Sequence, residues 1–361
     1  MIVENNTYVS QPQINAYLNN EYSFIPDLMP SDAVRMPTVQ VLYLLEKKLG
    51  AAYFNVFNSE KTVESPLAQR QLDSGAWLKR CNMVGINVRT IQSFWNVVKY
   101  NFTLPEAQEA IHLLPIWEPG VVASLYGMSS WQINPEFFSE ELYRAMPLLD
   151  TVEKQLKVVI NILHALGKTV GMDVIPHTDR FSEQVLANPQ YFEWLQRIDK
   201  GIVRHENNLH ETMQDLIMDF IKKDTVSVSL DKNDFFSKSF PEKERLKILF
   251  GEPNNYEKRL NRRIALMEWL YKNNFETVPA TMGPPYRGID VDTEGGIIAD
   301  DKGRIWRDYK ITKPEKFSRV FGPLTRYKLY ENKDNNADWA IDFTKPNVGA
   351  WDYAAQHYAE V

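Results

Sequence analysis

Two short apolar segments, each followed by polar or aromatic residues, restrict the fold of this chain more than any other feature. The first covers residues 110–116 and precedes a stretch rich in Trp, Pro, Gly and Tyr; the second covers residues 169–175 and precedes His-Thr-Asp-Arg. Between them, residues 151–166 have the spacing of an amphipathic helix, which Gly167 ends. Nearly continuous apolar runs are typical of buried parallel strands, so the order predicts a right-handed strand–helix–strand crossover. Such folds bind ligands just beyond the carboxyl ends of their strands.

The composition fits a globular protein with a large core. The chain has 361 residues, 44% of them hydrophobic, and its net charge of −6 argues against a nucleic-acid-binding surface. Cys81 is the single cysteine, so no intrachain disulfide can form and a reducing compartment is expected. The sequence shows no apolar run as long as a membrane span and no signal-peptide core at its start. We therefore predict a cytoplasmic protein without a membrane or nucleic-acid partner.

We predict an α/β fold with four segments along the chain. They are an N-terminal wrapping and helical segment at residues 1–80, three strand–helix units at 81–180, an inserted subdomain at 181–338 and a return to the first part at 339–361. The three units correspond to the start of a (β/α)8 TIM-type barrel, with its first strand inside residues 83–91. The mixed helical and β insertion follows the third strand, because β/α connections rarely exceed about a dozen residues.

Local signals predict further elements inside these segments. Residues 1–37 are polar and contain several prolines, so we expect them to cover a surface without forming a core. Apolar residues at helical spacing predict helices at residues 38–49, 189–223 and 242–273. Turn residues around position 301 predict a hairpin, and Thr344 is expected to cap a final helix.

Four segments, taken in order, resemble the alpha-amylase superfamily of glycoside hydrolases and glucanotransferases. Residues 114–117 are similar to the end of the family's second strand, and residues 126–137 are similar to the loop after it. Residues 168–179 resemble the third-strand motif, in which an Asp opens and a His closes an apolar run. Residues 342–346 resemble the segment that introduces the helix before the fourth strand. The resemblance implies an enzyme that acts on α-glucosides with retention, through a covalent glycosyl intermediate.

The resemblance also implies where the reacting groups lie. The family's catalytic carboxylates follow its later strands, which places them beyond Val361, so the chain is expected to be an N-terminal portion that is inactive alone. No cofactor is implied, and Pro176 stands where the family has the Asn that holds a calcium ion. The alternative is a non-catalytic relative that binds carbohydrate or serves as a scaffold, favoured by Met128 in place of a sugar-stacking Tyr. An unrelated β/α protein is a third possibility.

The candidate substrate-binding residues follow the second and third strands. They are His177, Tyr126, Trp131, Trp117, Asp179 and Arg180. His177 can donate a hydrogen bond to a sugar hydroxyl, or equally to a neighbouring loop. Trp117 can stack on a sugar or pack in the core. For Asp179 and Arg180, an ion pair with each other is favoured over a ligand contact.

Two aspartates are given structural roles, and no metal ligands are predicted. Asp173 lies within the apolar run, where a buried carboxylate needs partners such as backbone amides or Arg89. Asp342 is placed by its resemblance to the segment before the fourth strand. His205 and His210 are five residues apart, whereas the zinc-protease motif needs two His four apart on one helix face.

Overall fold

The computed structural model describes most of the chain. The described residues are 9–69, 77–79, 81–120, 125–173, 175, 177–199, 202–204, 209–224, 230–277, 297–299, 305–307, 324–328, 330–332, 341–346 and 348–360. The chain divides into two compact units, both of mixed helical and β content. The first unit consists of Met1–Ile116 and Ile133–Asp173, and the second of Trp117–Gln132 and Val174–Val361.

A three-stranded parallel sheet organises the first unit. Its strand order is β1-β2-β5, formed by Met83–Ile86, Ala110–Leu113 and Thr169–Met172. The β1–β2 and β2–β5 pairs are both parallel, which confirms that the two apolar segments lie side by side and run in the same direction. The prediction of a parallel α/β arrangement is therefore confirmed for three strands, whereas closure into a barrel stays a prediction.

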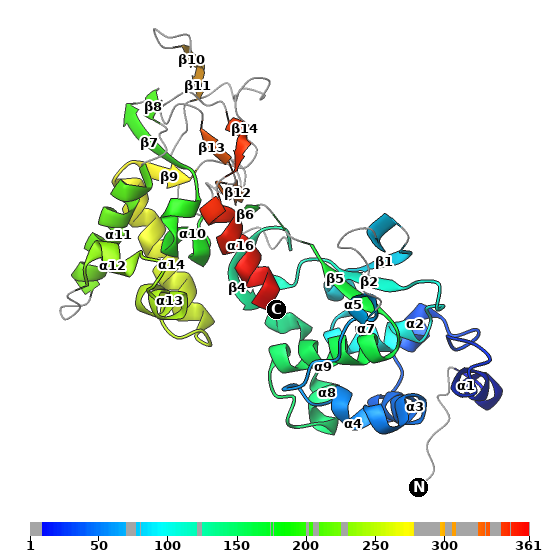
Figure 1. The fold of residues 1–361 in the computed structure, drawn as a ribbon. Coiled ribbons are helices and arrows are strands. Elements are labelled where there is room, and N and C mark those ends of the chain that lie inside the picture. Colours follow the sequence, from blue (N-terminus) through cyan, green and yellow to red (C-terminus); the bar gives the residue numbers. More distant parts are fainter. Residues whose placement is uncertain are drawn as a thin grey trace. The chain divides into compact units, whose positions relative to one another are not determined.

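Helices pack around this sheet in the first unit (Figure 1). They are α1 (Gln11–Leu18), α2 (Pro30–Ala33), α3 (Thr38–Leu49), α4 (Tyr53–Val56), α5 (Pro66–Gln69), α6 (Val88–Ile91), α7 (Phe94–Asn101), α8 (Glu140–Ala145) and α9 (Val152–Ala165). The predicted helix at residues 38–49 is confirmed as α3. Among the described residues, no helix is long and apolar enough to cross a membrane.

The predicted helix between the two apolar segments is confirmed as α9. Thr151 begins it, and its side chain accepts a hydrogen bond from the Lys154 amide at 3.2 Å. Leu156, Leu163 and their neighbours on the same face are buried, and α9 packs against α7 and β5. Burying one such leucine contributes about 1.5–3 kcal/mol. Gly167, with φ 85°, ends the turn because a residue with a Cβ rarely adopts this conformation.

The prediction that residues 1–37 only cover a surface is wrong for the part described from residue 9 onward. Ile14 and Tyr17 of α1 are buried, and the Tyr17 ring meets Phe102 edge-on with 5.6 Å between centroids. Pro12 fits α1 because it lies in the first helical turn, where its missing amide has no helical partner. Ile14 and Tyr17 lie three positions apart on α1, so the helix turns both side chains to the same, buried side.

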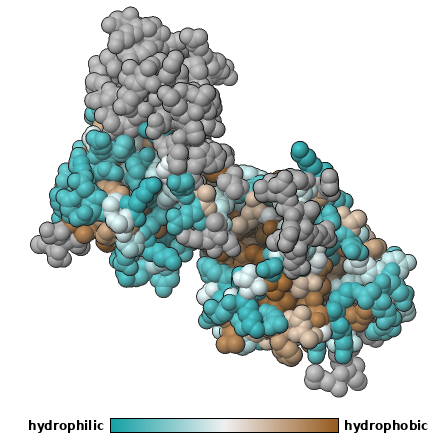
Figure 2. Space-filling view, viewed as in Figure 1, coloured by the Kyte–Doolittle hydropathy of each residue, from teal (hydrophilic) through white to brown (hydrophobic). Residues whose placement is uncertain are grey.

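The surface of the first unit also carries large apolar side chains, which Figure 2 shows as hydrophobic areas among hydrophilic ones. Val39 on α3 is 73% exposed, Phe54 on α4 is 79% exposed and Leu148 after α8 is 85% exposed. Apolar atoms make up much of any folded protein's surface, so these residues alone do not define a binding site.

The second unit combines helices with several small sheets. Its helices are α10 (Glu183–Ala187), α11 (Leu209–Asp224), α12 (Lys232–Phe235), α13 (Glu242–Phe250), α14 (Tyr256–Lys272) and α16 (Val348–Glu360). Its strands are β3 (Trp117–Pro119), β4 (Met128–Ile133), β6 (His177–Asp179), β7 (Trp194–Asp199), β8 (Ile202–Arg204), β9 (Phe275–Thr277), β10 (Ile297–Ala299), β11 (Ile305–Arg307), β12 (Leu324–Arg326), β13 (Tyr330–Asn332) and β14 (Ile341–Pro346). The pairs are β3-β4, β6-β12, β10-β11 and β13-β14, and β7 lies between β8 and β9.

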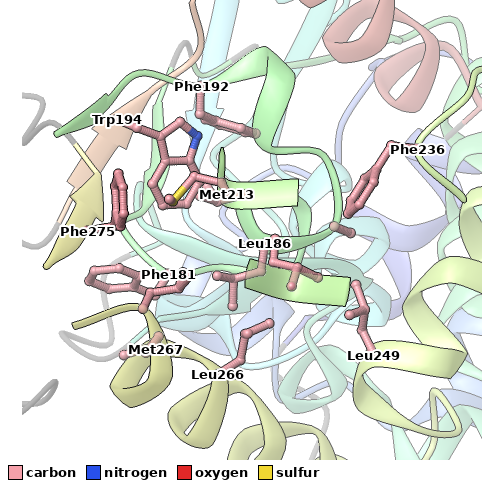
Figure 3. Close-up of a cluster of buried hydrophobic side chains, with 14 of the residues drawn as sticks. Phe181, Leu186, Phe192, Trp194, Met213, Phe236, Leu249, Leu266, Met267 and Phe275 are labelled. Atoms are coloured by element: carbon pink, nitrogen blue, oxygen red, sulfur yellow. The ribbon is translucent and has the colours of Figure 1, made fainter. Parts of the chain in front are cut away.

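A cluster of buried aromatic and aliphatic side chains holds the second unit together (Figure 3). Phe181 and Leu186 come from the α10 region, Trp194 from β7, and Leu266 from α14. The Trp194 indole donates a hydrogen bond to the Pro189 carbonyl at 2.8 Å, so its polar edge is satisfied inside the core. The cluster is separate from the first unit's core, as its members all belong to the second unit.

The predicted helix at residues 189–223 is wrong in its middle. Residues 194–199 and 202–204 form the antiparallel pair β7 and β8, and the long helix α11 begins only at Leu209. The strand β9 pairs with β7 on its other side, so tertiary pairing outweighs the helical spacing of its apolar residues. The other long helical prediction, at residues 242–273, is confirmed as α13 and α14.

The C-terminal predictions are confirmed only in part. The strands β10 and β11 are antiparallel, as the predicted hairpin requires, while the residues that connect them lie outside the described part. Thr344 lies within β14 and therefore does not cap α16, which begins at Val348. The Thr hydroxyl signal was misread because β-branched residues also favour strands.

Candidate functional site

The two tryptophans predicted to contact a sugar, Trp117 and Trp131, lie together in the second unit. Their ring centroids are 5.3 Å apart and the rings are nearly perpendicular. Trp117 is only 1% exposed. Trp131 stacks on the His357 ring at 4.5 Å, and its indole nitrogen donates to the Tyr353 hydroxyl at 3.0 Å. Both rings thus serve in packing between β3, β4 and α16.

The polar segment after β5 is a strand, whereas we predicted a loop with a mutual Asp–Arg pair. Asp179 accepts a hydrogen bond from the Phe181 amide at 3.1 Å. Arg180 donates to the carbonyl and the hydroxyl of Thr277 and forms an ion pair with Glu276 at 3.3 Å. At most 1% of either residue is exposed. The partners described for Arg180 are therefore groups of β9, and the partner described for Asp179 is a neighbouring backbone amide.

The remaining predicted residues lie elsewhere in the second unit. His177 begins β6, where it stands opposite Arg326 of β12. Asp342 lies in β14. The side chains of these two residues fall outside the described part, so their predicted roles stay predictions. Tyr126 is 43% exposed, and a sugar contact by its ring also stays a prediction.

In the first unit, an imidazole and a carboxylate meet on the parallel sheet. His112 belongs to β2, and Asp173 directly follows β5. His112 Nε2 lies 2.7 Å from Asp173 Oδ1, and the two side chains are 24% and 33% exposed. The flanking residues Ile111 and Leu113 are fully buried. Because side chains alternate along a strand, β2 buries one face and presents His112 on the other.

Glycines on both neighbouring strands flank His112. Gly85 of β1 and Gly171 of β5 are its register partners, which gives a Gly85–His112–Gly171 row across the sheet. A Cβ at Gly85 would meet nothing within 4 Å, and one at Gly171 would lie 3.5 Å from His112 Nδ1. Partners in register project to the same face, so the imidazole stands between two positions without side chains. A ligand can therefore approach the strand backbone at Gly85, whereas the His112 ring itself lies next to Gly171.

The contact with Asp173 assigns a role to each nitrogen of His112. An ionised carboxylate can only accept a hydrogen bond, so Nε2 carries the proton that faces Asp173. Nδ1 then has a lone pair in the neutral ring and an N–H in the charged ring. Within the described part of the chain Nδ1 has no hydrogen-bond partner. Nδ1 of His112 can thus accept a hydrogen bond from a ligand hydroxyl, or donate one to it when the ring is charged.

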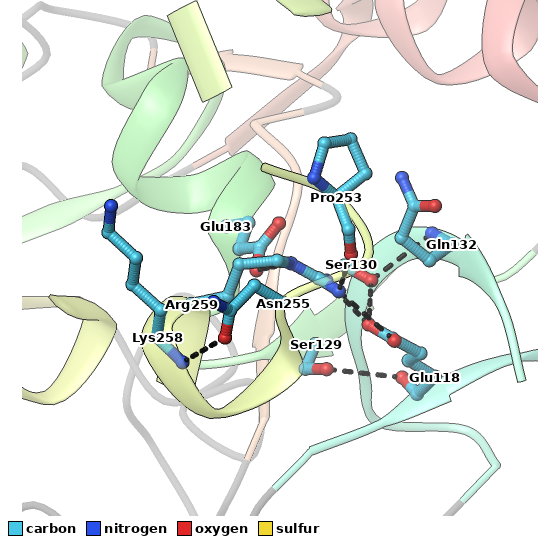
Figure 4. Close-up of polar contacts among 9 residues, drawn as sticks. All are labelled: Glu118, Ser129, Ser130, Gln132, Glu183, Pro253, Asn255, Lys258 and Arg259. Carbon is cyan, nitrogen blue, oxygen red and sulfur yellow. Dashed lines mark hydrogen bonds and ion pairs between the residues drawn. The ribbon is translucent and has the colours of Figure 1, made fainter. Parts of the chain in front are cut away.

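A buried ionic network in the second unit is built on Arg259 of α14 (Figure 4). Its NH2 and NH1 donate to the two carboxylate oxygens of Glu118 at 2.6 and 3.2 Å, and its Nε donates to Glu183 at 2.8 Å. Ser130 also donates to Glu118, at 2.5 Å. The three charged side chains are at most 8% exposed. Glu118 is therefore held on both oxygens and serves to fix β3 against α14 and α10.

Electrostatics in this network follow from burial. Burial raises the pKa of the Glu183 carboxyl above its usual value, although the neighbouring Arg259 opposes that rise. Burial also disfavours charge on Arg259, but hydrogen bonds and ion pairs with Glu118 and Glu183 outweigh it and raise the pKa of the guanidinium. The arginine stays charged, which is what two buried carboxylates require.

A second polar network connects α13 with α16. Glu242 pairs with His357 at 2.7 Å and accepts hydrogen bonds from the Tyr353 hydroxyl and the Asn188 amide, each at 2.8 Å. Burial alone would raise the pKa of Glu242, but these three hydrogen bonds outweigh it and lower the pKa. The network includes the hydroxyl that also binds Trp131, so it fixes packing within the second unit.

No protein-family model matches this chain, and no curated protein matches it. The described residues contain no group of three or more His, Cys, Asp or Glu side chains that could hold a metal ion. His205, whose spacing from His210 we rejected as a zinc motif, lies outside that part. The candidate site, the Gly85–His112–Gly171 row with Asp173, therefore rests on geometry alone.

Sequence reasoning found one half of this pair and missed the other. Asp173 was identified as a carboxylate in need of a partner, and its partner in the structure is His112. The signal for His112 was present, since a titratable residue interrupts an otherwise apolar strand sequence. Such a residue in a buried strand needs either a partner or a function. The glycines at 85 and 171 became informative only once the register placed them beside it.

Proposed function

We propose that the Gly85–His112–Gly171 row and Asp173 bind a sugar, an α-glucoside, on the open face of the parallel sheet. The observation that carries the proposal is a His–Asp pair, partly exposed, between two glycines on adjacent strands. A sugar hydroxyl both donates and accepts hydrogen bonds, so it matches a ring nitrogen that does either. The glycines allow the sugar ring to approach the backbone closely.

The same site supports a wider proposal, that the protein acts on α-glucosides as a hydrolase or glucanotransferase. Three parallel strands whose order in the sheet follows their order along the chain are how a (β/α)8 barrel begins, and such barrels carry their sites at the carboxyl ends of the strands. Asp173 lies at such an end. Its contact with His112 gives it the role of orienting the imidazole, so the row positions the sugar and is not assigned the retaining reaction itself.

A non-catalytic carbohydrate-binding or scaffold protein is the second candidate. Met128, at the position of the resembled family's sugar-stacking Tyr, is fully buried, and its carbonyl accepts a hydrogen bond from the Thr178 hydroxyl at 2.7 Å. A residue in this position contributes to the fold of the second unit. The aromatic contact of the resembled family is then missing from that position, which favours binding without turnover.

Titration of the full chain with maltotriose, followed by calorimetry, tests the binding proposal. His112→Ala removes the imidazole and is expected to weaken binding about tenfold, the effect of losing a hydrogen bond worth about 1.4 kcal/mol. Asp173→Asn keeps the shape but no longer fixes the tautomer, so it should weaken binding less. Asp150→Asn is the matched control, because it changes an exposed Asp that pairs only with Lys154. Equal affinities in all four proteins would contradict the proposal.

Assays for reducing sugar released from maltooligosaccharides separate the two candidates. Turnover that falls in the His112→Ala variant supports the enzyme. Binding without turnover supports the scaffold protein. If the wild-type chain neither binds nor converts these sugars, the α-glucoside proposal is wrong in both forms.

A further inference from the structure

A second candidate binding site lies at the opposite end of the same sheet. A cavity of about 570 Å³ is found where the strands begin, and Glu109, which precedes β2, and Lys168, which precedes β5, both line it. Its other walls come from α1 with the segment after it, α3 and the end of α7. The volume falls in the range of about 300–1,000 Å³ that small-molecule sites occupy. All of its lining residues belong to the first unit.

One buried polar atom in this cavity lacks a partner. Asn101, the last residue of α7, is 5% exposed, and its side-chain oxygen has no hydrogen-bond partner in the part of the chain that the structure describes. Buried amide oxygens are nearly always hydrogen-bonded, because leaving one unpaired is unfavourable. A ligand hydroxyl or N–H group would supply the missing donor once a shift of the wall opens this oxygen to the cavity, because it has less than 1 Å² of accessible surface.

Two lysines place ammonium donors in the same cavity. Lys48 donates to the Tyr17 carbonyl at 2.7 Å and to the Asn20 side chain at 2.6 Å. Lys168 is 4% exposed and donates to two backbone carbonyls, both at 2.7 Å. An ammonium group has three N–H bonds, so each lysine has one left beyond these hydrogen bonds, and the Lys48 ammonium also lies over the Tyr17 ring, 4.2 Å from its centroid. The protein backbone fixes both groups in place, with donors available for acceptor atoms of a ligand.

The charges around the cavity select against an anion. Three glutamates, Glu21, Glu106 and Glu109, line it together with the two lysines, so the five charged groups sum to −1. A phosphate or carboxylate ligand would meet this excess of negative charge. Tyr22, also in the wall, is 49% exposed and touches Phe24 edge-on at 5.8 Å. Its ring offers a flat apolar face beside polar donors and acceptors.

We propose that this cavity binds a small neutral sugar of one or two rings. In this assignment the Asn101 oxygen accepts from one hydroxyl, Lys48 and Lys168 donate to others, and Tyr22 covers an apolar face of the ring. Hydroxyl groups satisfy ammonium donors and amide or carboxylate acceptors at the same time, which no simple anion does. The site is independent of the Gly85–His112–Gly171 row, since the two lie at opposite ends of the strands.

The test is calorimetric titration of the full chain with glucose, maltose and trehalose, each also offered to two variants and a control. Lys48→Met removes one donor and is expected to weaken binding at this site at least tenfold. Lys47→Met is the matched control on the same helix, because Lys47 lies outside the cavity and contacts the Tyr43 ring. Its affinity is expected to stay within twofold of wild type. Titrations with inorganic phosphate and with glycine test the charge argument and are expected to show no binding.

Asn101→Leu provides an independent measurement if Lys48→Met folds poorly. Removing a buried unpaired oxygen should leave the melting temperature unchanged or raise it, while the sugar-dependent rise in melting temperature is lost. The proposal is overturned if none of the three sugars binds, if phosphate or glycine binds instead, or if both variants keep wild-type affinity. Sugar binding that only His112→Ala removes would overturn this inference and leave the proposed function standing.

Discussion

Replacing Arg259 by Met is expected to destabilise the second unit by about 3–5 kcal/mol, the cost of removing one partner from a buried ion pair. Arg259 holds Glu118 through two hydrogen bonds and Glu183 through a third. With side chains at most 8% exposed, the carboxylates have little access to water as a replacement. An exposed ion pair would lose only about 0–1 kcal/mol, so the size of the effect discriminates between the two situations.

Hydrogen exchange under increasing urea is the suitable assay, because two compact units need not unfold in one transition. Amides of α14 and β3 report on the second unit, and those of α9 report on the first. Arg259→Lys serves as the control, since lysine keeps the charge but cannot bind Glu118 with two parallel hydrogen bonds. We expect its loss to lie between wild type and Arg259→Met, with the exchange of α9 unchanged in both.

A double-mutant cycle and a pH series test the electrostatic reasoning. When Glu118 and Glu183 are both changed to Gln, Arg259→Met should cost about 1 kcal/mol or less, because no buried carboxylate is left unpaired. In the single Arg259→Met variant the deficit should be greatest at neutral pH and shrink as falling pH protonates the two carboxylates. A cost below about 1 kcal/mol at pH 7, or the same cost in both backgrounds, would refute the argument.

Three further predictions concern single residues. The pKa of Glu242 is lowered in the folded protein, so this residue adds stability above its unfolded pKa of about 4.3. That stability is lost as pH falls through the folded pKa. In the Glu242→Gln variant, the urea midpoint of the second unit should therefore decrease less at acid pH than in the wild type. Burial lowers the pKa of His164, so stability is complete above about pH 6.5 and declines below it. The stability measured by hydrogen exchange of α9 should therefore decrease with falling pH in the wild type, but not in the His164→Gln variant. The same decrease in both proteins would contradict this prediction. A Cβ at Gly120 would lie 2.2 Å from the Asp179 carboxylate, so Gly120→Ala should lower the urea-derived stability by about 1–3 kcal/mol; a loss under about 0.5 kcal/mol would show that the site relaxes freely.

The sequence predicted those parts of the fold whose signals are local. The helix α9 has its cap, apolar face and terminal glycine within one stretch, and β2 and β5 have continuous apolar runs beside it. The strand β6 could not be predicted in the same way, because its partner β12 begins only at Leu324. The pair β7–β8 was misread for a similar reason, since the stabilising strand β9 follows only after the four helices α11 to α14. Pairing across long distances leaves no periodic trace in either segment.

For the candidate site, the sequence showed which residues carry ionisable side chains, but not which residues lie next to them in space. Asp173 was recognised because a carboxylate in an apolar run needs a partner. Its partner His112 lies 61 positions earlier, and only the strand register brings the two together. Conversely, Trp117, Asp179 and Arg180 were candidate ligand contacts because they follow a strand, although all three are buried in the structure. Trp117 packs against Trp131, and Asp179 and Arg180 bond to protein groups. The position of a residue after a strand does not show whether its side chain lies at an exposed site or in the core.

The distance in sequence between Glu118 and Arg259 has a consequence for biosynthesis. The two residues are 141 positions apart, so the ribosome releases the carboxylate long before its arginine. At about 5–20 residues per second, these 141 residues take roughly 7–28 s. During this time residues 117–132 have been synthesised, while most of their own unit has not yet been translated. In the nascent chain, Glu118 therefore stays exposed to water until α14 has been made.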